Sequence, residues 1–135
     1  MARILLVEDD DQLRTMLKVL LTHSGYEVYE ATNGTGVCDT YEKQRFDLVL
    51  TDLVMPNREG LEVIMDLRRL DPAVRIIAIS GGGQGKAEDY LRVAKKLGVQ
   101  LTLSKPFSNQ EFLGAVCLAL ETQAYSDPTV DADLT

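Results

Sequence analysis

This sequence lacks the residues on which several common kinds of functional site depend. Its two cysteines, Cys38 and Cys117, are far apart and form no C-x-x-C pair, which excludes a dithiol redox motif and a thiolate metal site. We expect both to be reduced thiols in the core. The single histidine, His23, lies near a predicted helix end, and this position argues against a metal-binding or acid–base role.

Long apolar runs and an excess of basic residues are also missing. No apolar stretch approaches the roughly 18 residues of a membrane-spanning helix, and the N-terminus does not resemble a secretory signal. With 14 Lys and Arg against 21 Asp and Glu, the formal net charge is −7, so no basic surface for nucleic acid is expected. These absences predict a cytoplasmic protein without membrane or direct nucleic-acid contacts.

The sequence contains instead a regular alternation of strand and helix patterns. Short apolar or β-branched runs predict strands at residues 3–7, 27–31, 47–51, 74–79 and 99–103. Amphipathic patterns predict helices at residues 10–23, 35–43, 61–70 and 86–97, and from a Ser108 N-cap to about Gln123. The first helix should present one apolar face, made of Leu13, Met16, Leu17, Leu20 and Leu21. The alternation predicts an α/β fold with a doubly wound parallel sheet, because right-handed crossovers place helices on both of its faces.

The domain organisation is simple. The length of 135 residues and the unbroken alternation predict one domain over residues 1–123. Residues 124–135 lose apolar periodicity and carry three acids without a base, which predicts a disordered tail.

Charged residues lie where three of the predicted strands end. Glu8 and Asp9 follow the first strand, Asp52 follows the third, and Lys105 follows the fifth. The carboxyl ends of the strands in an open α/β sheet meet at the edge that carries its chemistry. Two carboxylates about 4 Å apart repel by on the order of 4 kcal/mol at an effective dielectric near 20, so three of them require a cation. Mg²⁺ suits such oxygen ligands together with a substrate phosphate, to which Lys105 would supply a positive charge.

Together these residues resemble the receiver domain of two-component response regulators, of the single-domain chemotaxis type, over about residues 2–122. The matching motifs are Glu8-Asp9, Asp52 with Met55-Pro56 and Gly60, Ser80-Gly81, and Lys105-Pro106-Phe107. Each motif alone is common, but all four in this order, each at a strand end, are highly specific. The resemblance implies a flavodoxin-like sheet of five strands in the order 2-1-3-4-5.

The resemblance also implies the chemistry of the site. Asp52 would be the nucleophile that takes a phosphoryl group from the phosphohistidine of a histidine kinase or a histidine phosphotransferase. Asp9 and Asp52 would ligate Mg²⁺ directly, Glu8 through water, and Val54 through its backbone carbonyl. The only implied reactions are Mg²⁺-dependent self-phosphorylation from a phosphodonor and self-dephosphorylation, so the chain is not expected to be an enzyme with a separate substrate.

Ser80 and Thr102 are the expected switch positions. Ser80 would donate its hydroxyl to the phosphoryl group, and Gly81 would leave the site open to the donor. Many receivers have an aromatic ring where this chain has Thr102, so the β-branched hydroxyl is expected to swing less far or to signal differently. The Lys105-Pro106 bond resembles the family's cis peptide.

The signal is expected to leave this chain through another protein. No effector domain is recognised in the chain, so the signal is expected to pass by contact with an effector protein, at the surface of the fourth helix, fifth strand and fifth helix. The alternative is a receiver module of a longer regulator. An aspartyl-phosphate phosphatase of the haloacid dehalogenase type is disfavoured, because it needs an aspartate where Val54 stands. A P-loop around Gly85-Lys86 also lacks its flanking residues.

Overall fold

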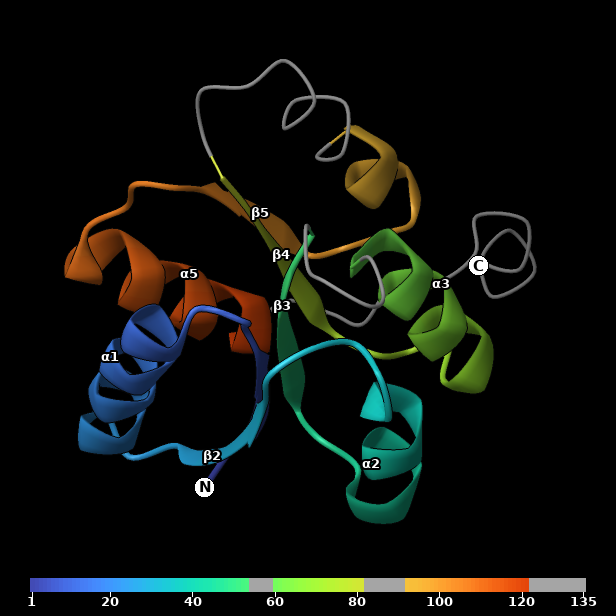
Figure 1. Cartoon of the computed structure of the whole chain (residues 1–135), viewed down its shortest axis with the longest axis horizontal. Helices are drawn as coiled ribbons and strands as arrows, with labels where there is room; N and C mark the ends of the chain where they lie inside the picture. The colour runs from blue at the N-terminus through green and yellow to red at the C-terminus, as the bar shows by residue number, and fades with distance from the viewer. Residues whose placement is uncertain (54–59, 82–91, 122–135) are drawn as a thin grey trace.

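The computed structural model describes residues 1–53, 60–81 and 92–121. In this part of the chain, five parallel strands form one sheet in the order β2-β1-β3-β4-β5, which confirms the predicted flavodoxin-like topology (Figure 1). The strands are β1 (Arg3–Val7), β2 (Glu27–Ala31), β3 (Leu48–Asp52), β4 (Ile76–Ser80) and β5 (Leu101–Ser104). The helices are α1 (Asp11–His23), α2 (Val37–Gln44), α3 (Gly60–Leu70) and α5 (Asn109–Glu121). Residues 92–96 are also helical, whereas the start of the predicted helix 86–97 and the predicted tail 124–135 lie outside the described residues.

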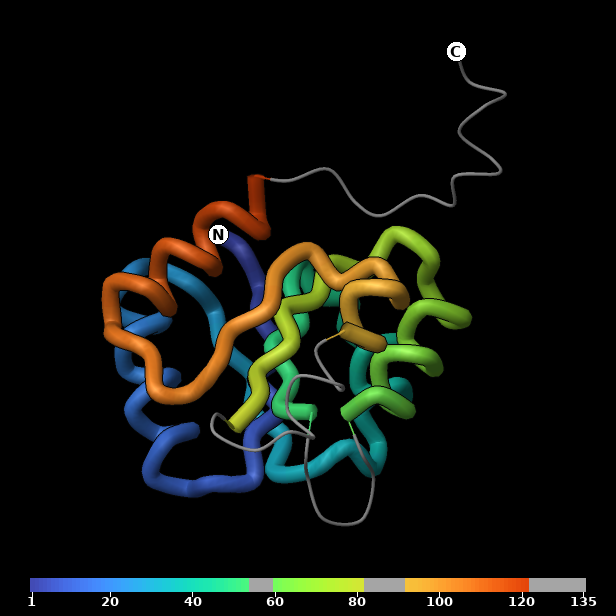
Figure 2. The backbone as a smooth tube through the Cα atoms, turned by 90° about the horizontal axis from the view of Figure 1, so that it is seen from above, coloured from blue at the N-terminus to red at the C-terminus, as the bar shows by residue number. Residues whose placement is uncertain are grey.

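The sheet separates two apolar cores. Helices α1 and α5 cover one face and α2 and α3 cover the other, as the view from above shows (Figure 2). Alternate residues of one strand serve different cores: Leu48 packs with the α1 and α5 side, and Val49 packs with the α2 and α3 side. All five residues of β3 are buried. Packing on both faces of the sheet therefore fixes the position of the end of β3, the central strand.

Three strands lie one or two residues further along the chain than predicted, because polar residues at their ends take part in the sheet. Asp52 pairs with Ile79, and Ser80 pairs with Ser104. At the other end of β4, the N–H of Val74 donates to the carbonyl of Asp71 in a turn, which delays the start of the strand. Asp52 and Ser80 thus belong to the ends of their strands rather than to the loops after them.

Helix α1 begins one residue later than predicted and presents a narrower apolar face. The side chain of Asp10 accepts a hydrogen bond from the N–H of Leu13 at 3.1 Å, so Asp10 rather than Asp11 is the N-cap. Leu17 and Leu21 are fully buried, whereas Met16 is 44% exposed. The prediction for Met16 was wrong because this residue falls beyond the edge of the buried stripe.

The cysteine prediction was also wrong in part. Cys38 is half-buried and Cys117 is exposed, and neither forms a disulfide bond. On α5 the neighbouring Val116 is buried, so Cys117 faces outward, with its sulfur 3.6 Å from a carboxylate oxygen of Glu121. Among the described residues, no helix is long and apolar enough to cross a bilayer.

Candidate functional site

The register of the sheet brings the predicted acids to one edge. Val7 of β1 pairs with Thr51 of β3, so the residues that follow them, Glu8 and Asp52, lie at the same level. The N–H of Glu8 donates to the carbonyl of Ala31 at 3.0 Å, which continues the ladder towards β2 by one residue. Strand pairing alone therefore places two carboxylates side by side at the carboxyl end of the sheet.

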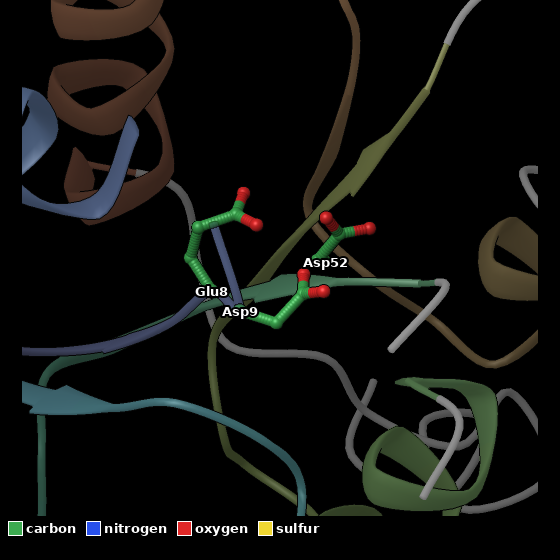
Figure 3. Close-up of side chains that lie close together, drawn as sticks. All are labelled: Glu8, Asp9 and Asp52. Atoms are coloured by element: carbon green, nitrogen blue, oxygen red, sulfur yellow. The ribbon is translucent and has the colours of Figure 1, made fainter. Parts of the chain in front are cut away.

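Asp9 completes a cluster of three carboxylates. One ligand oxygen each from Glu8, Asp9 and Asp52 can be chosen so that all lie within 4.8 Å of one another. Figure 3 shows the side chain of Asp9 turned towards Asp52. Glu8 and Asp52 are 1% and 4% exposed, but Asp9 is exposed. The cluster is thus buried on one side and open to solvent at Asp9, which confirms that the three acids come together as predicted.

A basic side chain lies against the two buried acids. The ammonium nitrogen of Lys105 is 2.9 Å from Oδ2 of Asp52 and 3.2 Å from Oε1 of Glu8. Its backbone N–H donates to the carbonyl of Ser80 at 2.8 Å, and the Lys105-Pro106 peptide is cis, as predicted. Burial lowers the pKa of Lys105, but the hydrogen bond and charge of Asp52 outweigh it, and the pKa is raised overall. Lys105 therefore stays charged beside Asp52.

Lys105 does not neutralise the negative charge of the three carboxylates, and the raised pKa of Glu8 reflects its burial and this excess of negative charge. Burial, and next the charge of Asp52, raise the pKa of Glu8 from 4.5 to about 7, against the opposing effects of the Asp10 N–H and of Lys105. Oε1 of Glu8 is buried, and its cationic neighbour Lys105, at 3.2 Å, does not lie in hydrogen-bond geometry with it. Three carboxylates that share one lysine keep a net negative charge, and this set of oxygen ligands fits a hard divalent cation such as Mg²⁺.

The raised pKa of Glu8 predicts how stability depends on pH when metal is removed by EDTA. Because the folded state holds this proton more tightly than the unfolded chain, the stabilisation is present at low pH and is lost as the pH rises through about 7. Between about pH 5.5 and about pH 8, the parent should lose about 2 kcal/mol of unfolding free energy relative to Glu8→Gln. Urea unfolding of both proteins at the two pH values measures this difference, and parallel pH profiles would contradict the assignment.

For the remaining predicted site residues, the structure gives a position without a tested role, or no description. Ser80 is buried at the end of β4, and its hydroxyl donates to the carbonyl of Gly81 at 3.3 Å. Thr102 is half-buried in β5 and pairs with Ala78, two residues before the level of Ser80. The switch roles of Ser80 and Thr102 stay predictions. The predicted carbonyl ligand, Val54, lies outside the described residues, as do Met55-Pro56 and Gly82.

The contact of Arg14 with the acidic cluster could not be read from the sequence, and Gly60, a residue of the Asp52 motif, lies in a helix that was predicted to begin after it. Arg14 of α1 donates to the backbone carbonyl of Glu8 at 2.9 Å. Gly60 is the first residue of α3 rather than part of a preceding loop, and its N–H donates to the carbonyl of Leu53 at 3.0 Å. The spacing of Arg14 from Asp11 predicts an i,i+3 ion pair on the helix, but contacts with a neighbouring strand end cannot be read from spacing.

Comparison with known proteins agrees with this geometry. The family model described as the response regulator receiver domain matches residues 4–117. The chain is 35% identical to the chemotaxis protein CheY of Thermotoga maritima over 115 residues, which cover 84% of this chain and 93% of that protein. It is 32% identical to sporulation initiation phosphotransferase F of Bacillus subtilis over 114 residues, 84% of this chain and 90% of that protein.

Solved structures show the same fold. A response regulator receiver domain protein from Clostridium thermocellum superposes with a TM-score of 0.82 at 27% identity, covering 90% of this chain and 95% of that one. A CheY-like receiver domain protein from Methanospirillum hungatei gives a TM-score of 0.80 at 26% identity, with 90% and 94% covered. The chain belongs to the response regulator receiver domain family, the phosphoacceptors of two-component signalling.

Proposed function

We propose that Asp52 is the residue that accepts the phosphoryl group, at a Mg²⁺ site formed by the acidic cluster. Asp9 and Asp52 would bind the metal directly and Glu8 through water, with Val54 adding its backbone carbonyl. The observation that carries the proposal is the position of Asp52. It is buried at the end of the central strand, within 4.8 Å of two further carboxylates and 2.9 Å from the ammonium group of Lys105.

The proposed reaction is a transfer from nitrogen to oxygen. A carboxylate oxygen of Asp52 forms a bond to phosphorus while the bond from phosphorus to the donor histidine breaks, and the imidazole nitrogen keeps the electron pair. When bound at the three carboxylates, Mg²⁺ would supply positive charge for the phosphoryl oxygens. Lys105 contributes a second positive charge beside the same carboxylate. Asp9, as the exposed member of the cluster, leaves the acceptor side open to a partner.

The proposed donor is a histidine kinase or a histidine phosphotransferase, and the proposed receiver of the signal is an effector protein bound by surface contact. The similarity to chemotaxis proteins and to a sporulation phosphotransferase supports a place in a two-component system or phosphorelay. The net charge of −7 opposes direct binding to nucleic acid. The proposed location is the cytoplasm. The chain would only gain and lose its own phosphoryl group, without acting on a separate substrate.

Phosphorylation by a small donor tests the proposal. The protein is incubated with acetyl phosphate in Mg²⁺ or in EDTA and weighed intact. We expect one added phosphoryl mass with Mg²⁺, none with EDTA, and none in Asp52→Asn. Asp47→Asn is a matched control, because Asp47 belongs to the same segment but is exposed and binds the backbone N–H of Arg3 at the opposite end of the sheet. An equal mass gain in Asp52→Asn would overturn the assignment.

A slow loss of the phosphoryl group is a further prediction, and it rests on the sequence alone. Two residues after Asp52 and two after Ser80, the chain has Val54 and Gly82, which offer no amide or carboxylate to orient an attacking water. A group that positions water contributes about 10² to 10⁴ in rate when complete, and one amide contributes less. Val54→Asn, alone and with Gly82→Glu, should therefore shorten the lifetime of the label after the donor is removed. Equally fast decay in the parent would contradict this prediction.

A further inference from the structure

Arg14 has an unusual environment for a helical arginine near the surface. Its side chain is only 12% exposed, and its guanidinium group contacts three separate elements. One terminal nitrogen donates to the backbone carbonyl of Glu8 at 2.9 Å, and the other lies 2.6 Å from Oδ1 of Asp11. The third nitrogen, Nε, is buried and lies 3.5 Å from Oε1 of Glu30 in β2. Arg14 therefore links the end of β1, the start of α1 and β2.

The contact with the Glu8 carbonyl matters because of where that carbonyl lies. It belongs to the peptide bond that joins Glu8 to Asp9, two of the three acids in the cluster. The N–H of Glu8 is held by Ala31, and the N–H of Asp10 donates to Oε2 of Glu8 at 3.2 Å. Arg14 fixes the carbonyl between these two points. The direction in which Asp9 leaves the strand end thus depends on the guanidinium group.

We propose that Arg14 is a positioning residue of the metal site, which holds the Glu8–Asp9 peptide so that the three carboxylates converge on one cation. This inference rests on the function proposed above. Arg14 touches neither the cation nor the phosphoryl group, and it acts through the backbone of Glu8. Its planar fork reaches the carbonyl and Asp11 with different nitrogens, which a single ammonium group at this position does not reproduce.

The charge and the geometry of Arg14 have opposite effects on cation binding, and this difference makes the role measurable. A positive charge near the cluster repels Mg²⁺, so removal of the charge alone would tighten binding. Removal of the carbonyl contact would let the Glu8–Asp9 peptide turn, which would weaken binding. Residues that orient metal ligands without touching the metal typically change affinity by about 10- to 100-fold when replaced. If Arg14 positions the site, the loss of geometry outweighs the loss of charge.

The test is a calorimetric titration of the full chain with Mg²⁺, without a phosphodonor. The variants are Arg14→Gln, which removes charge and fork, and Arg14→Lys, which keeps the charge. The matched control is Lys18→Gln, because Lys18 also pairs with Glu30, at 3.3 Å, but does not contact Glu8. Circular dichroism at the titration temperature shows which variants are folded. If Arg14→Gln is not folded, Arg14→Lys alone provides the test.

We expect both Arg14 variants to bind Mg²⁺ about tenfold more weakly than the parent, and Lys18→Gln to bind with the parent's affinity or slightly more tightly. With acetyl phosphate, the Arg14 variants should need more Mg²⁺ for half-maximal phosphorylation but approach the parent's rate at saturation, a split that general loss of structure would not give. Tighter or unchanged binding in Arg14→Gln would overturn the inference, as would a lower rate at saturation with unchanged affinity. Failure of the parent to bind Mg²⁺ would instead refute the proposed function.

Discussion

Replacing Gly60 with alanine is expected to lower the free energy of unfolding by roughly 3 kcal/mol or more, because extra volume in a packed site forces the backbone to shift. A β-carbon at this position would collide with the carbonyl oxygen of Asp52 and would lie 2.6 Å from the α-carbon of Leu53. Both obstacles are backbone atoms at the end of the buried central strand, so they cannot rotate away. The same displacement should impair phosphorylation, since it moves the residue proposed to accept the phosphoryl group.

Gly114→Ala is the matched control for this prediction. Gly114 lies in α5, and a β-carbon there would meet no atom within 4 Å apart from its chain neighbours and the adjacent backbone of its own helix. This variant should gain about 0.5 to 1 kcal/mol, because alanine favours a helix over glycine. Urea unfolding of the parent and both variants gives the comparison. If Gly60→Ala were as stable as the parent, α3 would not start against the end of β3 as the structure shows.

Asp9→Ala should weaken Mg²⁺ binding by more than tenfold, the larger end of the range for groups that support a metal site, because Asp9 is proposed as a direct ligand. The variant should also be more stable than the parent in EDTA, since it removes a negative charge from beside Glu8 and Asp52. Loss of metal binding together with a gain in stability would distinguish a ligand from a structural residue.

Asp10→Ala provides the contrasting result from the adjacent residue. Asp10 caps α1 through the N–H of Leu13, so its removal should lower the free energy of unfolding by about 0.5 to 2 kcal/mol and leave Mg²⁺ affinity nearly unchanged. Calorimetric titration with Mg²⁺ and urea unfolding separate the two effects. Equal losses of affinity in Asp9→Ala and Asp10→Ala would mean that the acids form a diffuse negative surface rather than a defined site.

The predicted site residues that the structure brings together share one property, which is their position in sequence at the end of an apolar run. Glu8, Asp52 and Lys105 each close such a run, and parallel strands of a doubly wound sheet end at the same edge, so their convergence follows from strand pattern and topology. The distances within the cluster do not follow from the pattern. They depend on the register of β1 against β3 and on the turn after Val7.

The residues that sequence analysis placed wrongly or missed are those decided by tertiary packing. Met16 continues the apolar pattern of α1 but lies outside the contact of that helix with the sheet, and Cys117 faces outward although the cysteine side chain suits a core. Arg14 carries the ordinary signature of a helical ion pair, while its contact with Glu8 joins a helix to a strand end. Contacts between different elements of the fold do not follow the periodicity of one helix or strand, so the sequence pattern does not reveal them.

The most direct test of the account is to locate the phosphoryl group in the chain. The protein is phosphorylated with acetyl phosphate and Mg²⁺ and then reduced with borohydride, which converts an aspartyl phosphate to homoserine, and the modified peptide is sequenced by mass spectrometry. We expect modification at Asp52 alone, dependent on Mg²⁺. Modification at Glu8 or Asp9 with Asp52 unmodified would contradict it.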